Sequence, residues 1–377
     1  VDGTTRRLVD QTLDVVRHVG GDGDVALLGH SMATDVLIRV AREMQNTGPL
    51  VLISAFSNEI TPTFPRDLLL IAGAWEPRLT AFSEEMVSLV TPDGDALRRA
   101  AVIAPYSDHV SILQSIAARK AALTWIDGYY QRNAPLSVPP TGWWLIGLLA
   151  GIVALTPMLA HYLPGTAVPP KPLIPRRFLA VAILPAIVAP LVAVPLDINV
   201  LPVLVADYLA LHLAVLGVLQ LCLLWWFGVR PTRLSVSAVA LIFVWGIGVF
   251  GFALDRYGAN FMPNLPRLWI IVALGLGTIP FMVADALLTG AGHGPLWHRV
   301  VARLGFLGSL ALAVVLDFDG LFFLILIAPV IVLFYIIFGL MGRWVAQRSG
   351  ASSAGLGLGL VLAWALGVSF PLFAASK

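Results

Sequence analysis

The sequence predicts two parts of different class, a partial doubly wound α/β sheet followed by an all-α bundle of transmembrane helices. Of the 377 residues, 58% are hydrophobic and 12% are charged, and the mean hydropathy is +0.86, which is too apolar for a soluble protein of this size. The charges are unevenly spread, because residues 1–133 hold 12 of the 24 Lys and Arg and 16 of the 22 Asp and Glu. Residues 1–133 therefore predict a water-soluble domain, and residues 141–377 predict a membrane domain.

Net charge and cysteine content exclude several classes of partner. The formal net charge is only +2, which gives a nucleic acid no basic surface to bind. One cysteine, Cys222, excludes a disulfide framework and a cysteine-ligated metal site, and we expect neither a metal nor another cofactor. The Pro-rich stretch 134–140 cannot continue a helix and predicts a short, stiff linker between the two domains.

Short apolar runs and longer segments of helical spacing alternate in the first domain. The runs predict strands at 25–29, 50–54, 68–72 and 101–104, and their continuous apolarity is typical of parallel strands covered on both faces. Helices are expected directly after Ser31, near 80–90 and from 110 to 130. The chain begins at Val1 without an initiator Met, and four strands would leave one sheet edge bare. We therefore expect further strands upstream.

The pentapeptide Gly29-His-Ser-Met-Ala33 follows the first predicted strand and precedes a helix. A serine on such a sharp turn needs small flanking residues, and its hydroxyl then projects beside the helix N-terminus. The usual last residue is Gly, so Ala33 is a departure by one methyl group. By itself the pattern fits either an activated nucleophile or a serine that only caps a helix.

The residues that follow the later strands favour a nucleophile. A nucleophilic serine needs a general base, and the base needs a carboxylate that holds its tautomer. Glu76 follows the strand at 68–72, and His109 follows the strand at 101–104 and is expected to open the last helix. Ser31, Glu76 and His109 thus appear in the order nucleophile, acid, base, each at the carboxyl end of a strand.

Three other residues are competitors for these roles. Asp108 is the second choice for the acid, although neighbouring residues on a loop rarely face each other. Asp35 is expected to stabilise the N-terminus of its helix. His30 is expected to point away from the nucleophile.

Three motifs carry a family resemblance: Gly-His-Ser-Met-Ala (29–33), Gly-Ala-Trp-Glu-Pro (73–77) and Ser-Asp-His-Val-Ser (107–111). Residues 8–130 resemble the C-terminal two thirds of an α/β-hydrolase domain, of the lid-poor bacterial type related to dienelactone-hydrolase-like and lipase-like esterases. The resemblance implies Ser31 as nucleophile, His109 as base, Glu76 as acid and the backbone N–H of Met32 as an oxyanion-hole donor. In this family the second donor comes from a loop after an early strand, which we expect upstream of these residues, so the resemblance implies activity for the parent protein and leaves the activity of this fragment open.

The spacing of the motifs indicates an open site. The 45 positions from Ser31 to Glu76 suffice for one helix and two strands but leave no room for an inserted lid. Esters, thioesters and activated amides are all compatible with stabilisation of a tetrahedral oxyanion.

The second domain contains eight apolar stretches near the length that spans a bilayer as a helix. They are predicted near 142–161, 177–196, 200–227, 235–254, 268–289, 300–316, 320–341 and 353–375.

The charges between these spans predict an orientation. The connections after the odd-numbered spans contain nine basic residues: Lys171, Arg176, Arg177, Arg230, Arg233, Arg299, Arg303, Arg343 and Arg348. The connections after the even-numbered spans contain Arg256 and Arg267 together with Asp197, Asp255, Asp317 and Asp319. The positive-inside rule then places the first set in the cytoplasm and the soluble domain on the outer face of a bacterial inner membrane.

Two carboxylates fall within predicted spans. Asp207 and Asp285 each occupy the pattern Pro-x-x-Val-Ala-Asp-x-Leu, at 202–209 and 280–287. A carboxylate within the membrane indicates an ion or proton path, or else a hydrogen-bonded structural acid, which we favour. His212 is placed to pair with Asp207.

The function predicted from these features is that of a membrane-anchored serine hydrolase that cleaves ester or acyl bonds with a Ser-His-Glu triad. Tethering to the bilayer favours lipid-like substrates. Two alternatives remain open. One is a transporter or channel whose hydrolase domain is degenerate, in which Asp207 and Asp285 would carry the function. The other is an acyltransferase that uses the same triad. The sequence predicts no particular protein partner.

Overall fold

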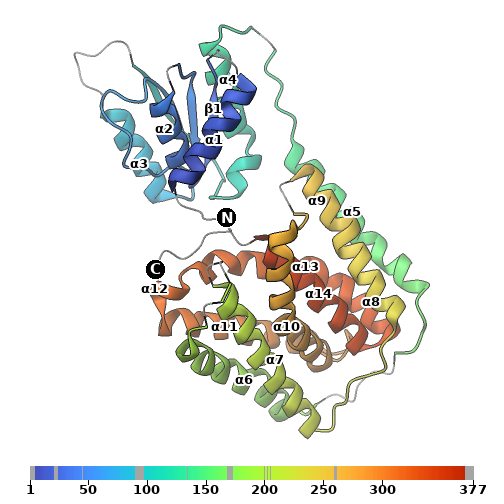
Figure 1. Ribbon diagram of the computed structural model, residues 1–377. Coiled ribbons are helices and arrows are strands. Elements are labelled where there is room, and N and C mark those ends of the chain that lie inside the picture. Colours follow the sequence, from blue (N-terminus) through green and yellow to red (C-terminus); the bar gives the residue numbers. More distant parts are fainter. Residues whose placement is uncertain are drawn as a thin grey trace. The chain divides into compact units, whose positions relative to one another are not determined.

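The computed structural model describes residues 5–20, 24–44, 46–89, 97–133, 135–167, 173–198, 200–201, 203, 205–258 and 261–369. The chain divides into two compact units, one ending at Trp144 and the other beginning at Leu145 (Figure 1). Residues 139–141 lie at the end of the first unit, where Arg119 contacts them. Its guanidinium donates to Pro139 O at 3.0 Å and to Thr141 Oγ1 at 2.7 Å.

Within the described residues, four parallel strands form the sheet of the N-terminal unit, in the order β1-β2-β3-β4. Their bounds are β1 (Leu27–His30), β2 (Leu50–Ile53), β3 (Asp67–Gly73) and β4 (Arg98–Ala104). All four strands point the same way, so their carboxyl ends lie along a single edge of the sheet.

Helices cover both faces of the sheet (Figure 1). One face packs against α1 (Thr5–Gly20), α2 (Ala33–Glu43) and α3 (Pro77–Ser88), and the other packs against α4 (Ile116–Tyr129). Successive residues of β2 alternate between the two cores, because neighbouring strand side chains point to opposite faces. Leu50 and Leu52 belong to the first core, and Val51 and Ile53 to the second. The predicted α/β class is confirmed.

The single helix expected over 110–130 is interrupted. A short 3₁₀ helix, η1 (Ser111–Gln114), comes first, and Ser115 then caps α4 by accepting a hydrogen bond from the N–H of Ala118. His109 consequently lies in the loop before η1 and does not open the long helix. The break arises because the Ser115 backbone is extended and its hydroxyl satisfies a helix-terminal N–H.

Within the described residues, eight helical segments of the second unit are long and apolar enough to cross a membrane. They are α5 (Thr141–His161), α6 (Pro175–Leu196), α7 (Ala206–Trp226), Val236–Tyr257, α10 (Leu265–Leu288), α11 (Leu296–Leu316), Phe318–Ser349 and α14 (Ala351–Ser369). The fourth segment comprises α8 (Val236–Phe243), the π-helix η2 (Val244–Gly251) and α9 (Phe252–Tyr257), and the seventh comprises α12 (Phe318–Leu321) and α13 (Phe323–Ser349). These helices are those of an integral membrane protein, as predicted; residues 370–375 of the predicted last span lie outside the described residues.

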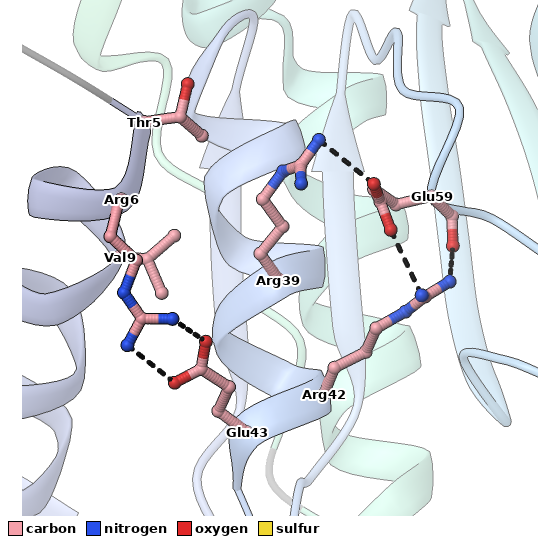
Figure 2. Close-up of a pocket in the computed structure, with 7 residues that line it drawn as sticks. All are labelled: Thr5, Arg6, Val9, Arg39, Arg42, Glu43 and Glu59. Carbon is pink, nitrogen blue, oxygen red and sulfur yellow. Dashed lines mark hydrogen bonds and ion pairs between the residues drawn. The ribbon is translucent and has the colours of Figure 1, made fainter.

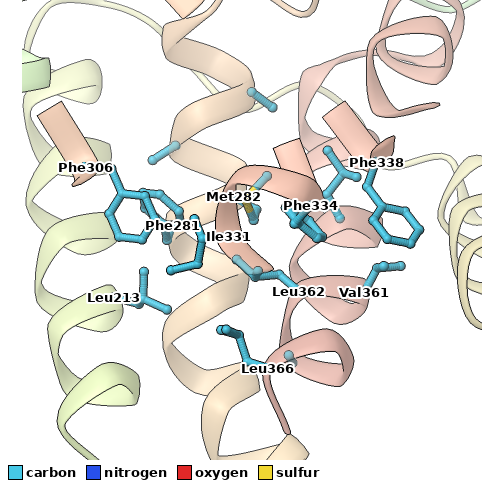
Figure 3. Close-up of a cluster of buried hydrophobic side chains, with 14 of the residues drawn as sticks. Leu213, Phe281, Met282, Phe306, Ile331, Phe334, Phe338, Val361, Leu362 and Leu366 are labelled. Carbon is cyan, nitrogen blue, oxygen red and sulfur yellow. The ribbon is translucent and has the colours of Figure 1, made fainter. Parts of the chain in front are cut away.

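The core of the membrane unit is built around α10 and α14. In α14, 83% of the apolar stretch is buried, against 22% in α5. Figure 3 shows Phe281 of α10, Phe334 of α13 and Leu362 of α14 in one apolar cluster. Glycines bring the two central helices together, because a Cβ at Gly355 or Gly359 would lie 2.5–2.6 Å from a Cα atom of α10.

The basic residues of the predicted connections lie partly within helices. Arg299 and Arg303 occupy the first turns of α11, and Arg343 and Arg348 occupy the last turns of α13. Lys171 lies outside the described residues.

Candidate active site

Ser31 lies on a sharp turn between β1 and α2 with a φ of 57°. Its N–H donates to the carbonyl of Ile53 at 2.9 Å, and its own carbonyl accepts from the N–H of Thr34 at 2.9 Å. A Cβ at position 29 would lie 2.6 Å from Leu37 Cδ1 and 3.3 Å from Ala33 O. The Leu37 side chain and the Ala33 backbone thus leave little room for a side chain at position 29, and a small residue at 33 suits the same close approach.

The structure brings the three residues singled out in the sequence into one hydrogen-bonded chain. His109 Nε2 lies 2.8 Å from Ser31 Oγ, and His109 Nδ1 lies 2.6 Å from Glu76 Oε1. An ionised carboxylate can only accept a hydrogen bond, so the proton of His109 sits on Nδ1. Nε2 is then free to accept the hydroxyl proton of Ser31.

The Glu76 carboxylate is held by groups other than His109. It is 9% exposed, at the start of α3, and its Oε2 accepts hydrogen bonds from Gly73 N at 2.9 Å and from Ser54 Oγ at 2.7 Å. A Cβ at Gly73 would clash with the carbonyl of Ser107 and lie 2.9 Å from Glu76 Oε2. Both carboxylate oxygens thus act as acceptors, which orients Oε1 toward the imidazole.

Ser54 was not found by the sequence reasoning. It is fully buried at the carboxyl end of β2, with a φ of 49°. Its position at the same sheet edge as Ser31 was the only available signal, and that position does not say which way its hydroxyl points.

His30 contacts His109, and the expectation that it points away from Ser31 stays a prediction. Its ring packs beside that of His109, with centroids 4.9 Å apart, and its Nε2 donates to the backbone carbonyl of His109 at 2.6 Å. Burial lowers the pKa of His30, which favours the neutral imidazole. His30 therefore helps to position the segment that carries His109.

The two acidic competitors have structural partners. Asp108 Oδ1 accepts hydrogen bonds from the N–H groups of Val110 and Ser111 and from the Ser111 hydroxyl. The hydrogen bond from the Ser111 N–H lowers the pKa of Asp108. Asp35 lies in the first turn of α2 and accepts Arg39 Nε at 2.8 Å. Glu76 is the carboxylate that the structure places against the imidazole ring.

Large apolar side chains are exposed at positions adjacent in sequence to Ser31, Glu76 and His109. Met32 follows Ser31, Trp75 precedes Glu76, and Val110 follows His109, and all three side chains are exposed. Tyr106 in the same loop as His109 is 84% exposed, and Phe56 beyond β2 is also exposed. We call Met32, Phe56, Trp75, Tyr106 and Val110 the apolar rim. The backbone of Met32 is the N-cap of α2, and the first N–H groups of a helix have no intrahelical acceptor.

Comparison with protein-family models, with curated proteins and with solved structures finds no match to this chain. The site is therefore interpreted from its geometry and its sequence motifs.

A separate pocket of about 260 Å³ lies between α1 and α2 and contains none of the three residues (Figure 2). Its charges are paired with each other. Arg6 contacts Glu43 at 2.6 Å, while Arg39 and Arg42 contact Glu59 at 3.0 and 3.1 Å. Because these guanidinium and carboxylate groups satisfy one another, the pocket is explained as a surface ion-pair network.

The two intramembrane candidates lie apart from each other and have different partners. Asp207, at the start of α7, accepts the N–H groups of Val200 and Leu201 at 3.1 and 2.8 Å. Asp285, near the end of α10, accepts Arg303 Nη2 at 3.1 Å. Pro202 and Leu204 of the repeated pattern lie outside the described residues.

The predicted pairing of His212 with Asp207 is wrong. His212 instead contacts the hydroxyls of Tyr208 and Ser309 at 2.8 and 3.1 Å, because Asp207 turns toward the backbone that precedes its helix. Within the described residues, no three His, Cys, Asp or Glu side chains are grouped to hold a metal ion.

Proposed function

We propose that this protein is a membrane-embedded serine hydrolase that cleaves ester or acyl bonds with Ser31, His109 and Glu76. The observation that carries the proposal is the hydrogen-bonded chain Ser31 Oγ, His109 Nε2, His109 Nδ1, Glu76 Oε1 at 2.8 and 2.6 Å. The resemblance of residues 8–130 to α/β-hydrolases supports it, as does the strained turn that presents Ser31.

The arrangement suits acyl transfer through a covalent intermediate. Ser31 Oγ attacks the substrate carbonyl carbon while His109 Nε2 takes the hydroxyl proton, and Glu76 stabilises the resulting imidazolium. The Met32 N–H, which the family resemblance implies as an oxyanion-hole donor, then stabilises the oxyanion. The tetrahedral adduct collapses to an acyl-Ser31 ester, and the leaving alkoxide takes the proton from His109. Water then attacks the ester, with His109 again as base, and releases the carboxylic acid and free Ser31.

The apolar rim supports an acyl substrate with a long apolar part. Exposed aromatic and aliphatic side chains beside a reactive group favour contact with apolar surface. A membrane-borne ester would present such a surface to a domain that is joined to a membrane helix through a short linker. We further propose that this domain lies outside the cytoplasm, because the arginine-rich helix ends of the bundle are on the side opposite to the start of α5 in the predicted topology.

The first test is labelling of the full chain in membranes with a fluorophosphonate probe, which reacts with activated serines. We expect the wild type to be labelled, and we expect Ser31→Ala and His109→Ala to lose labelling. Ser88→Ala, at the exposed end of α3, is the matched serine control and should be labelled as the wild type is.

Absence of labelling in a folded wild-type protein would overturn the proposal. Undiminished labelling of Ser31→Ala would assign the reactivity to another serine. Analysis of products from a labelled acyl donor separates hydrolysis from transfer, because hydrolysis yields only the free acid.

A further inference from the structure

Three arginines form a cluster: Arg299 and Arg303 near the start of α11, and Arg343 near the end of α13. Arg303 donates to Asp285 at 3.1 Å and to the carbonyl of Arg299 at 3.1 Å, and its guanidinium carbon lies 4.6 Å from the centre of the Tyr335 ring. The positive charges of Arg303 and Arg343 both act on Arg299. Asp285 is the one carboxylate in α10, α11 and α13, so the cluster keeps an excess of positive charge.

Two of these guanidinium groups have unused donors. Within the described residues, the buried Nε atoms of Arg299 and Arg343 have no hydrogen-bond partner, and the same holds for the buried hydroxyl of Tyr335. Buried polar groups are ordinarily hydrogen-bonded, so such donors indicate an acceptor that is not part of the chain. Arginine donors in this number suit a phosphate group.

An apolar groove of about 590 Å³ lies between α11 and α13, and its first lining residue on α11, Leu307, is one helical turn after Arg303. Its walls include Leu307, Leu310 and Val314 of α11 and Ala328, Val332 and Leu333 of α13.

The cluster and the groove lie on the same faces of their helices. On α11, Arg299, Arg303 and Leu307 follow one another at intervals of four, which places them on one face. On α13, Gly339 is seven residues after Val332, and Arg343 is four residues after Gly339, so all three lie on one face. A Cβ at Gly339 would meet nothing within 4 Å, so this face of α13 is open at the position between Val332 and Arg343.

The distance from the arginines to the far end of the groove matches an acyl chain. The 11 residues from Arg303 to Val314, the last lining residue of α11, correspond to about 16 Å of helix, which is about half of the 30 Å hydrocarbon thickness and therefore one leaflet. We propose that α11 and α13 bind one anionic phospholipid, with its phosphate on Arg299 and Arg343 and one acyl chain in the groove. Basic pockets between membrane helices hold such headgroups.

The test uses the full chain, purified in a nonionic detergent and stripped of lipid. Native mass spectrometry follows its titration with dioleoyl-phosphatidylglycerol, dioleoyl-phosphatidylcholine and inorganic phosphate. We expect one phosphatidylglycerol to bind about tenfold more tightly than phosphatidylcholine, and the double variant R299Q/R343Q to lose about tenfold or more in affinity for phosphatidylglycerol. The matched control is R230Q/R233Q, in a different connection of the bundle, which should bind as the wild type does.

A second variant tests the acyl-chain part. Gly339→Leu fills the open space and should weaken phosphatidylglycerol binding without changing the response to inorganic phosphate. Equal affinity for the two lipids, or unchanged lipid binding in R299Q/R343Q, would overturn the proposal. Phosphate that binds as tightly as the lipid, together with no effect of Gly339→Leu, would replace it with a site for free anions. If R299Q/R343Q does not fold, the wild-type headgroup preference and Gly339→Leu still decide.

Discussion

Three non-glycine residues with positive φ lie along the sheet edge where the site residues meet. Ser31, Ser54 and Tyr106 have φ values of 57°, 49° and 54°, and they follow β1, β2 and β4 along one sheet edge. A non-glycine residue in this region costs about 1–2 kcal/mol. Strain of this kind collects at functional sites, where the surrounding packing holds it. Ser31 presents its hydroxyl to His109 and Ser54 supports Glu76, so two of the three strained residues have a direct place in the hydrogen-bonded chain.

The acid role can be tested by comparing two carboxylates in neighbouring loops. Glu76→Gln keeps the size of the side chain but removes the charge that fixes the His109 tautomer, so we expect the rate of fluorophosphonate labelling to fall by about 10³-fold or more. Asp108→Asn should change this rate by less than about twofold, because Asp108 contacts only the start of η1. Equal loss in the two variants would contradict the assignment of Glu76.

His30 predicts a dependence of stability on pH. Its pKa is lowered from the ordinary value of 6.5 by burial, so the unfolded chain binds more protons than the folded one just below pH 6.5. Stability is then fully present above pH 6.5 and falls as the pH drops toward the lowered pKa. We expect His30→Gln, which keeps a donor for the His109 carbonyl, to reduce the decline of the melting temperature between pH 7.5 and 5. Parallel curves for the two proteins would refute this.

At the scale of elements, the sequence predicted the three residues of the hydrogen-bonded chain but not the residues that hold them in place. Ser31, Glu76 and His109 could be predicted to converge because each follows a parallel strand, and parallel strands end at one edge. Side-chain direction is not encoded in such positions, so the contact of His30 with His109 and the hydroxyl of Ser54 could not be predicted.

The spacing of small residues in the sequence could have predicted the close contact between α10 and α14. Gly355, Gly359, Ala363 and Gly367 recur at intervals of four, which is typical of close helix packing in membranes. A Cβ at Gly359 would lie 2.6 Å from Ile279 Cα, and the Gly359 carbonyl accepts a hydrogen bond from Thr278 Oγ1 at 2.8 Å.

This contact gives a prediction for bundle stability. Gly359→Leu must push α10 away and should destabilise the bundle by about 1–3 kcal/mol, measured by thermal unfolding of the full chain in detergent. Gly147→Leu on α5 is the control, because a Cβ there meets nothing within 4 Å, and it should shift stability by no more than about 0.5 kcal/mol. Similar losses in both variants would contradict the central position of α14.

At the scale of the whole molecule, the two ends of the bundle differ in charge. The helix ends around the α10–α11 and α13–α14 connections contain four arginines and Asp285, whereas the opposite ends contain Asp197, Asp207, Asp255, Asp317 and Asp319 with two arginines. The sequence could predict this asymmetry because it depends only on the order of spans and charges. It could not predict that the charge of Arg343 acts on Arg299, because the distance between them depends on how α11 and α13 pack.

The proposed orientation can be tested with single cysteines. In a Cys222→Ser background, Asn133→Cys should react with a membrane-impermeant maleimide added to intact cells, whereas Arg233→Cys should react only after the membrane is permeabilised. Both positions are exposed. The gel shift of each variant is the readout, and the reverse pattern would place the α/β domain in the cytoplasm.

The burial of α14 has a consequence for biogenesis. The ribosome makes α5 to α13 before it makes the helix against which α10 and α13 pack. A nascent chain therefore reaches the membrane with the glycine-facing surface of α10 uncovered, and the earlier helices can insert but cannot complete their packing. Insertion and final assembly are thus separated in time, and a chain cut before Ala351 should be integrated into the membrane yet be recognised by quality control as incomplete.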